Sequence, residues 1–473
     1  MLLKKKKFIL LLTFMVMAGI VFTSCGGDDA PSDDTIVDPD PDPDPDPDPT
    51  GFLGEIDFVK TFGGSDIDEA NDVVQADDGS YVIIGSTKST DGDITDKSDP
   101  SNDFWVLKVN PQGEKVWSKT YGGSNDDEGY SLSKTDDGGY ILIGYSRSSD
   151  GDVGGNEGFQ DIWIVKIDGS GNLQWETHHG FLGGEQGLSV VQTSDGGYFA
   201  VGFLDLAGSG GQGDDLLPDD KGDSRNNRHG LGEYWGIKLD ANGNKEWRRY
   251  FGGTNNDRGY DVLQTSDNGY LLTGAAESND FDITNPKGSY DYWAIKINDQ
   301  GDIQWEKSFG GSEIDNGFSV TETTDGNFIF VGDTRSADQD VSNLKGNADL
   351  WAVKFSSTNG SIIWERTYGG TQFDSAQSIT PMSSGKYVIA GSSRSVDGDV
   401  AENNGQNDAW ILVINESGVP QFEMNLGGSE LDFGNGAIET TDNKLILVGE
   451  TDSNDGDITQ NKGIKDLMIA KIK

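Results

Sequence analysis

The stretch Asp161-Ile-Trp163-Ile-Val-Lys166-Ile-Asp168-Gly-Ser-Gly171-Asn-Leu-Gln-Trp175 has related copies in seven places along this 473-residue chain. Its apolar residues alternate, which predicts a β-strand, and the acid and glycines of its middle predict a tight turn into a second strand. A glycine landmark follows each copy and recurs every 58 or 59 residues, apart from one interval of 72. This fixed period predicts a repeat architecture. The landmark glycines are Gly63, Gly122, Gly180, Gly252, Gly310, Gly369 and Gly427.

One repeat unit contains four short segments with strand character. In the second unit they are Gly129–Thr135, Tyr140–Ser146, Asp161–Ile167 and Asn172–Thr177. The Asp-Asp-Gly-Gly turn between the first two supplies the positive-φ positions that a hairpin needs. Runs of four short strands are typical of propeller blades. We therefore predict an all-β fold, a seven-bladed β-propeller with four antiparallel strands per blade.

The two ends of the chain complement each other. Residues 55–63 match the fourth segment of a unit, and residues 466–473 match the third. An N-terminal strand that completes the last blade would remove an exposed sheet edge. We therefore expect a ring closed by the N-terminal strand; an open solenoid is the alternative.

All eleven tryptophans fit this arrangement, and we expect these large side chains to pack between blades. Six lie on the third segment and five on the fourth: Trp105, Trp163, Trp235, Trp293, Trp351 and Trp410, then Trp117, Trp175, Trp247, Trp305 and Trp364.

At these residues the repeat resembles known families. The run from Lys166 to Trp175 is similar to the tryptophan-docking repeat of quinoprotein-type propellers, and the whole unit resembles repeat lipoproteins of Bacteroidota. The resemblance covers about residues 55–473 and implies the propeller fold. Quinoprotein dehydrogenases have eight blades and a vicinal disulfide, whereas this chain has seven units and one cysteine. We therefore expect no PQQ cofactor.

The N-terminus has the pattern of an export signal. Lys4–Lys7 precede the apolar run Phe8–Phe22, which has the length of a signal-peptide core rather than of a membrane span. Phe22-Thr-Ser24-Cys25 resembles the lipobox of bacterial lipoproteins, and the resemblance implies a lipid on Cys25. The acidic residues after Cys25 resemble a surface-export signal of Bacteroidota lipoproteins. The expected location is the outer membrane, lipid-anchored and facing the cell surface, with the periplasmic face as the alternative.

These features divide the chain into a signal peptide at 1–24, a lipidated cysteine and tether at 25–50, and the propeller at 51–473. The Asp-Pro alternation at 38–49 predicts an extended tether, because proline restricts φ and like charges repel. A net charge of −46 argues against binding nucleic acid. A single cysteine excludes an intrachain disulfide.

Two acidic patterns recur on the loops expected at one end of the propeller. The first is an acid five residues after each landmark glycine, for which we weigh a place around the channel mouth against a turn acid that caps backbone N–H groups. These acids are Asp68, Asp127, Glu185, Asp257, Asp315, Asp374 and Asp432.

The second pattern is Asp-x-Asp followed by a further Asp nine or ten residues later. Several carboxylates in one short loop suit Ca²⁺, which takes oxygen ligands, so we predict possible calcium sites, with Asx turns as the alternative. The candidate ligands are Asp91, Asp93, Asp103, Asp150, Asp152, Asp161, Asp280, Asp282, Asp291, Asp338, Asp340, Asp349, Asp397, Asp399, Asp408, Asp455, Asp457 and Asp466.

The third unit departs from the repeat. Its longer loop contains Asp214 and Asp215 and then the basic cluster Arg225, Arg228 and His229, a concentrated positive charge on an acidic body. We predict this loop as a candidate ligand-binding segment for an anionic sugar or a protein partner, with a disordered excursion as the alternative.

No serine elbow, phosphate loop or metalloprotease motif occurs, so we predict no catalytic residues. The favoured function is a monomeric binding or interaction scaffold at the cell envelope, with a glycan or an envelope protein as its partner. The alternatives are a carbohydrate-active enzyme similar to glycoside hydrolases and a role in envelope assembly.

Overall fold

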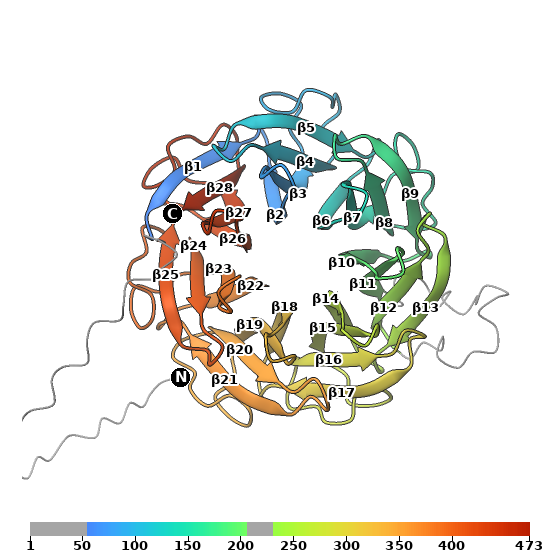
Figure 1. Ribbon diagram of the computed structural model, residues 1–473, viewed down its shortest axis with the longest axis vertical. Coiled ribbons are helices and arrows are strands. Elements are labelled where there is room, and N and C mark those ends of the chain that lie inside the picture. Colours follow the sequence, from blue (N-terminus) through green and yellow to red (C-terminus); the bar gives the residue numbers. More distant parts are fainter. Residues whose placement is uncertain (1–53, 206–229) are drawn as a thin grey trace, which may run out of the picture. The chain divides into compact units, whose positions relative to one another are not determined.

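The computed structural model describes residues 54–205 and 230–473. They form seven four-stranded antiparallel sheets arranged as blades around a central axis (Figure 1). The predicted seven-bladed β-propeller is therefore confirmed. Within the described ranges, no helix is long and apolar enough to cross a membrane. The predicted signal peptide, Cys25 and the tether lie outside the described residues.

Each blade begins at the axis and proceeds outward along the chain. The innermost strands are β2 Asp68–Gln75, β6 Asp127–Lys134, β10 Glu185–Gln192, β14 Asp257–Gln264, β18 Asp315–Glu322, β22 Asp374–Pro381 and β26 Asp432–Glu439. The second strands are β3 Tyr81–Thr87, β7 Tyr140–Ser146, β11 Tyr198–Asp205, β15 Tyr270–Ala276, β19 Phe328–Thr334, β23 Tyr387–Ser393 and β27 Leu445–Thr451.

The third strands are β4 Asp103–Val109, β8 Asp161–Ile167, β12 Gly232–Leu239, β16 Asp291–Ile297, β20 Asp349–Phe355, β24 Asp408–Ile414 and β28 Asp466–Ile472. The outermost strands are β5 Lys115–Tyr121, β9 Leu173–His179, β13 Lys245–Phe251, β17 Ile303–Phe309, β21 Ile362–Tyr368, β25 Pro420–Leu426 and β1 Ile56–Phe62. Blades are numbered one to seven from β2–β5 to β26–β28 with β1.

The predicted bounds are correct for β7 and β8, and they differ for β6 and β9. The strand β9 begins at Leu173 rather than Asn172, because Asn172 closes the preceding turn through hydrogen bonds to Asp168. The strand β6 begins at Asp127, two residues before the predicted start. Asp127 is already paired with Ser146 of β7, so the acid belongs to the sheet.

The last blade is completed by the first strand. Its order is β1-β28-β27-β26, and the register pairs Ile56 with Ile472 and Phe62 with Leu467. Glu55 and Lys473 exchange two backbone hydrogen bonds, of 3.1 and 2.8 Å, at the free end of this pairing. The ring is therefore closed by the N-terminal strand, and the open solenoid is wrong.

Hydrophobic clusters lie between neighbouring blades. Trp163 of β8 is fully buried and packs with Ile84 of the preceding blade. It sits opposite Gly144 of β7 in the register. A Cβ on Gly144 would lie 1.8 Å from the carbonyl oxygen of Glu128, so the close approach of β6 requires glycine there. This geometry recurs around the ring and confirms that the tryptophans of the third strands pack between blades.

The tryptophans of the outermost strands make a different contact. Trp117 of β5 is half-buried. Its ring lies against Gly171, the turn glycine of the next blade, where a Cβ would be 3.2 Å from Trp117 Cζ3. Gly171 has φ +80°, which also favours glycine. The recurring Asp-Gly-Ser-Gly…Trp pattern therefore holds the outer wall of one blade to the turn of the next.

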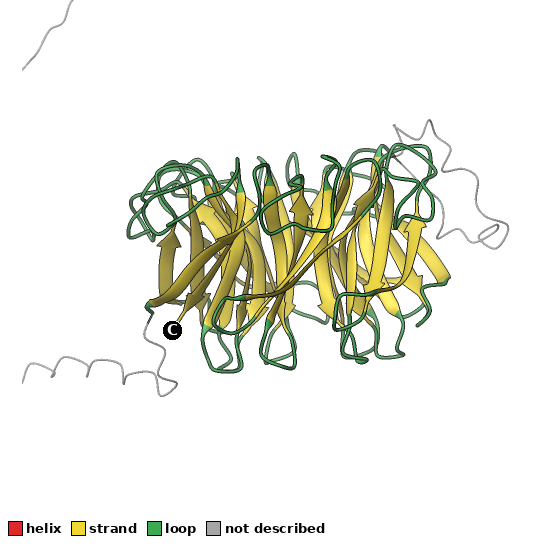
Figure 2. Cartoon of the chain, turned by 90° about the horizontal axis from the view of Figure 1, so that it is seen from above, coloured by secondary structure: helices red, strands yellow, loops and turns green. Residues whose placement is uncertain are grey.

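The two ends of the propeller differ. One end carries the loops between second and third strands and the connections between blades, and we call it the loop face (Figure 2). The other end carries short hairpin turns. The loop face is where the sequence departs most from its repeat, so the functional site is sought there.

Candidate functional site

The acids that follow the landmark glycines lie beneath the turns of the loop face. Asp68 is fully buried at the start of β2. Its Oδ2 accepts hydrogen bonds from the Gly64 backbone N–H at 2.7 Å and from Ser89 Oγ at 2.8 Å, and Thr87 Oγ1 donates to its Oδ1. Burial raises the pKa of Asp68, and these hydrogen bonds oppose the shift. The residue ties a turn to two strands.

In the other six units the equivalent acid also accepts a hydrogen bond from a backbone N–H of the turn; Glu185 accepts from the Phe181 N–H at 2.9 Å but has no described hydroxyl donor. All seven acids are fully buried. These acids begin the innermost strands, as predicted, but they are buried and accept from backbone N–H groups, so the structure supports the alternative of turn acids. The reason is that the N–H groups of the landmark turn draw each carboxylate under the turn.

The first two acids of the Asp-x-Asp pattern also accept from this turn. In blade four, Asp280 Oδ1 accepts from the Thr254 N–H at 2.9 Å, and Asp282 Oδ2 accepts from the Gly252 N–H at 3.1 Å. These bonds repeat at the equivalent positions of blades one, two, five, six and seven. The pattern thus joins the loop of each blade to the connection that precedes it.

The third acid of the pattern is buried at the start of each third strand. Asp291 accepts hydrogen bonds from the N–H groups of Lys287 and Gly288. Burial raises its pKa to about 7, and the nearby Asp315 carboxylate contributes. In blade seven, a Cβ on Gly63 would lie 2.6 Å from both Asp466 Oδ1 and Asp68 Oδ2. The equivalent pair of carboxyl groups also lies close to Gly122, Gly310 and Gly427.

Lysine pairs with the second acid of the pattern at three blade junctions. Lys287 pairs with Asp340 of the next blade at 3.3 Å. Lys345 pairs with Asp399, and Lys462 pairs with Asp93 across the closure of the ring. The ammonium group neutralises the second acid of the pattern in these blades. In the described part of the chain, no group of three or more metal-ligating side chains has the geometry of a metal site.

The calcium hypothesis stays a prediction, and we place it first at the junction of blades one and two, where Lys97 pairs with Asp103 at 3.2 Å and no lysine of the described residues pairs with Asp152. There, burial and the nearby Asp96 raise the pKa of Asp152, and Asp150 and Asp152 line a cavity of about 340 Å³. We expect millimolar Ca²⁺ to raise the melting temperature by roughly 5 °C over EDTA, since calcium at 100 times its Kd adds about 2.7 kcal/mol. Differential scanning calorimetry measures the shift.

The double change Asp150→Asn and Asp152→Asn is expected to abolish that shift. The matched change Asp338→Asn and Asp340→Asn should leave it intact, because Lys287 already neutralises Asp340. Equal melting temperatures in calcium and EDTA would contradict the prediction and leave all of these acids as turn formers.

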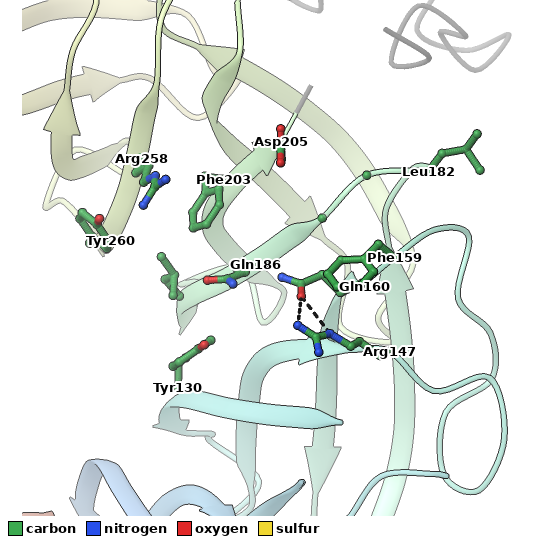
Figure 3. Close-up of a pocket in the computed structure, with 13 residues that line it drawn as sticks. Tyr130, Arg147, Phe159, Gln160, Leu182, Gln186, Phe203, Asp205, Arg258 and Tyr260 are labelled. Atoms are coloured by element: carbon green, nitrogen blue, oxygen red, sulfur yellow. Dashed lines mark hydrogen bonds between the residues drawn. The ribbon is translucent and has the colours of Figure 1, made fainter. Parts of the chain in front are cut away.

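A larger pocket opens at the loop face, where the channel wall meets blades two, three and four (Figure 3). Its volume is about 800 Å³, within the usual range for small-ligand sites. Figure 3 shows Arg147 of blade two and Arg258 of blade four on different sides of it, with Phe203 of blade three between them. Two guanidinium groups therefore face one pocket on a chain of net charge −46.

Both arginines are held by aromatic rings. The Arg147 guanidinium lies 4.5 Å from the Phe159 ring centroid, and Gln160 Oε1 accepts from its Nε at 3.2 Å and its Nη2 at 3.1 Å. The Arg258 guanidinium lies 5.1 Å from the Phe203 ring centroid. Cation–π contacts and the amide acceptor orient the two charges before any ligand arrives.

An alignment of the repeat units shows that the sequence changes at this pocket. At the second position of the innermost strand, blades one and two have Glu69 and Glu128, whereas blades three and four have Gln186 and Arg258. The charge on this row therefore changes from negative in the first two units to neutral in the third and positive in the fourth. We predicted function in that unit from its long loop, and missed Arg147 and Arg258 because they belong to other units. The predicted candidates Asp214, Asp215, Arg225, Arg228 and His229 lie outside the described residues.

Comparisons with known proteins add little to this description. No family model matches the chain. The regulatory protein FlaEY of Caulobacter vibrioides is 25% identical over 232 residues, which are 46% of this chain, and the match spans 23% of that protein's length.

Solved structures with a similar fold include the WD40 domain of Neurospora crassa Pan2, at 10% identity and a TM-score of 0.46 over 87% of this chain and 95% of that one. BamB from Moraxella catarrhalis has 12% identity and a TM-score of 0.36 over 86% and 85%. A Bacteroides caccae protein of unknown function has 11% identity and a TM-score of 0.39 over 68% and 90%. The structure of the chain itself therefore establishes that it is a seven-bladed β-propeller.

Proposed function

We propose that this protein is a lipid-anchored scaffold of the cell envelope that binds its partner at the loop face, in the pocket between blades two and four. The observation that carries the proposal is the meeting of Arg147 and Arg258 in one pocket of a strongly acidic protein. A pair of oriented guanidinium groups recognises anionic groups through directed hydrogen bonds.

The surface around the pocket supports a binding role. Phe159 is 61% exposed and Leu182 is 52% exposed beside the two arginines. Large exposed apolar side chains next to oriented charges are common at binding surfaces. Among the described residues that line the pocket, Asp205 is the one carboxylate, whereas glycoside hydrolysis generally uses two. Binding is therefore favoured over hydrolysis.

The proposed anchor rests on the sequence. The signal-like run that ends at Phe22-Thr-Ser24-Cys25 supports lipidation of Cys25 and placement at the outer membrane, facing the cell surface. The length of an extended 26–50 segment, on the order of 70 Å at about 3.1 Å per residue, would hold the propeller clear of the membrane.

Photo-crosslinking in cells that produce the full chain tests the proposal. With p-benzoylphenylalanine in place of Leu182, we expect an ultraviolet-dependent product of higher mass in the membrane fraction. The matched position is Val116, which is 54% exposed on the outer strand β5 and should give no product. Cys25→Ala should move the chain to the soluble fraction without changing its melting temperature. No product at 182, or equal products at both positions, would refute binding at this face.

A further inference from the structure

We infer that the pocket between blades two and four binds an acidic saccharide in which the carboxylate is carried on the sugar ring, such as a uronic acid oligomer. The inference rests on the proposed function and names the ligand class of the same site. It follows from the charges, the aromatic rings and the polar groups that the pocket brings together.

The first supporting feature is the set of N–H hydrogen-bond donors that the two arginines offer. A guanidinium has five N–H donors. Among the described residues, Arg147 uses Nε and Nη2 on Gln160 and Nη1 on Asp126, the last at 3.4 Å. Donors therefore remain for a carboxylate, while the Gln160 contact prevents the guanidinium from rotating. Arg258 is exposed on the opposite wall and is oriented by Phe203.

The second supporting feature is the row of aromatic rings that lines the pocket. Tyr130, Phe203 and Tyr260 are half-buried and line the pocket, and Phe159 is exposed at its edge. Such rings give flat apolar surfaces with polar edges. A pyranose has the matching form, because one face is lined by C–H groups and its rim carries hydroxyls.

The third supporting feature is the short distance between the charges and the rings. The Arg258 guanidinium packs 5.1 Å from the Phe203 ring centroid, so a ligand carboxylate that reaches this guanidinium lies next to the aromatic rings of the pocket wall. In a uronic acid the carboxylate is bonded directly to the ring, so its charge and its C–H face lie side by side. In an acidic peptide the carboxylate is on a flexible chain with no such face, which makes the saccharide the better fit.

The fourth supporting feature is the presence of hydrogen-bond partners for the hydroxyl groups of a sugar. Gln186 is half-buried on the pocket wall, and its amide offers both a donor and an acceptor. The Tyr130 hydroxyl donates to Glu128 Oε2 at 3.0 Å, so its oxygen remains an acceptor. Sugar hydroxyls both donate and accept, and these groups meet both requirements.

Isothermal titration of the full chain with trigalacturonate tests this inference. We expect binding that weakens at least tenfold in Arg147→Met and in Arg258→Met. Arg394→Met is the matched control: Arg394 follows β23 as Arg147 follows β7, stacks 5.9 Å from the Phe373 ring centroid, and lies outside the pocket. This control should bind as the unchanged protein does. The methyl ester of trigalacturonate, which lacks the charge, should bind at least tenfold more weakly.

Three results would overturn the inference: no binding of trigalacturonate, equal weakening by Arg394→Met, or tighter binding of tetraglutamate than of the saccharide. Melting temperatures of the variants identify any loss of affinity that comes from unfolding. If trigalacturonate fails while the photo-crosslink at position 182 persists, the saccharide is wrong and the scaffold stands. If both fail, the proposed binding face is wrong as well.

Discussion

Deletion of residues 51–62 is expected to lower the melting temperature by roughly 10 °C or more, or to leave the chain insoluble. The deletion removes β1, which pairs with β28 and carries the buried Phe62 and the partly buried Phe58 and Val59. It also exposes the edge of β28, whose residues are buried. Calorimetry and size-exclusion chromatography of the purified chain measure the effect.

A circular permutant provides the control. Residues 63–473 followed by Gly-Ser-Gly and then residues 55–62 would join Lys473 to Glu55 as Asp168 is joined to Asn172, by the same backbone hydrogen bond across the turn. The last blade then forms from one continuous segment, and stability should return to within about 1 kcal/mol of the original chain. A deleted chain that melts like the original, or a permutant that stays unstable, would show that β1 does not hold the ring closed.

The second large effect is a loss of stability between pH 4 and pH 8. Burial raises the pKa of Asp103 and Asp291 to about 7, and that of Asp161 to about 6. The same cause raises Asp349, Asp408 and Asp466 to about 6. Their ordinary value is 3.8, so the folded chain binds more protons than the unfolded chain in this range. The stability they contribute is present below pH 4 and is lost as the pH rises through 6 and 7.

The acids whose pKa is lowered affect the stability of the fold in a lower pH range. Hydrogen bonds from Thr135 and Lys166 outweigh burial and lower the pKa of Asp137 to about 2. Its contribution is therefore constant above pH 4 and is lost only as the pH falls toward 2. Maximum stability is expected near pH 4, and the melting temperature should fall by roughly 10 °C between pH 4 and pH 8. A melting temperature that is flat or rises over this range would contradict the raised pKa values.

One substitution distinguishes the effect of these buried carboxyl groups on the melting temperature from the effect of charge repulsion across an acidic chain. Asp161 Oδ1 and Glu185 Oε1 are buried without a hydrogen-bond partner among the described residues, and each raises the cost of ionising the other. In Asp161→Asn the introduced amide removes one charge and offers a donor. We expect a higher melting temperature than that of the original chain at pH 8 and a shallower pH dependence. The half-buried turn acid Asp168, whose pKa is lowered by hydrogen bonds from Asn172, serves as control, since Asp168→Asn should keep the original pH dependence above pH 4.

The fold was predictable from the sequence because its determinants are local and repeated. Period-two alternation places Trp163 in a strand, and turn chemistry places Asp168 to Gly171 in a hairpin, within a few residues of each other. The complementary ends predict ring closure. Some predicted strand limits differ from the observed ones. At Asn172, a hydrogen bond from the backbone N–H to the Asp168 side chain places the residue in the turn rather than in the strand.

The candidate site was predicted only in part. The long loop of the third unit follows Asp205, which lines the pocket, but the described residues that form the pocket come from three blades. Arg147, Phe203 and Arg258 are far apart in the sequence, and no local pattern relates them. They meet only because the ring brings the loop faces of neighbouring blades together.

The sequence by itself therefore determined the number of blades, the place of each strand and the closure of the ring, since these depend on hydrogen bonds and apolar periodicity within short segments. The tertiary structure alone decided which acids are buried and which cations meet. Asp68 and Asp457 look alike in the sequence, yet one is fully buried under a turn and the other remains partly exposed. Burial and the distance between charges set pKa and binding, and both arise only when segments distant in the chain pack together.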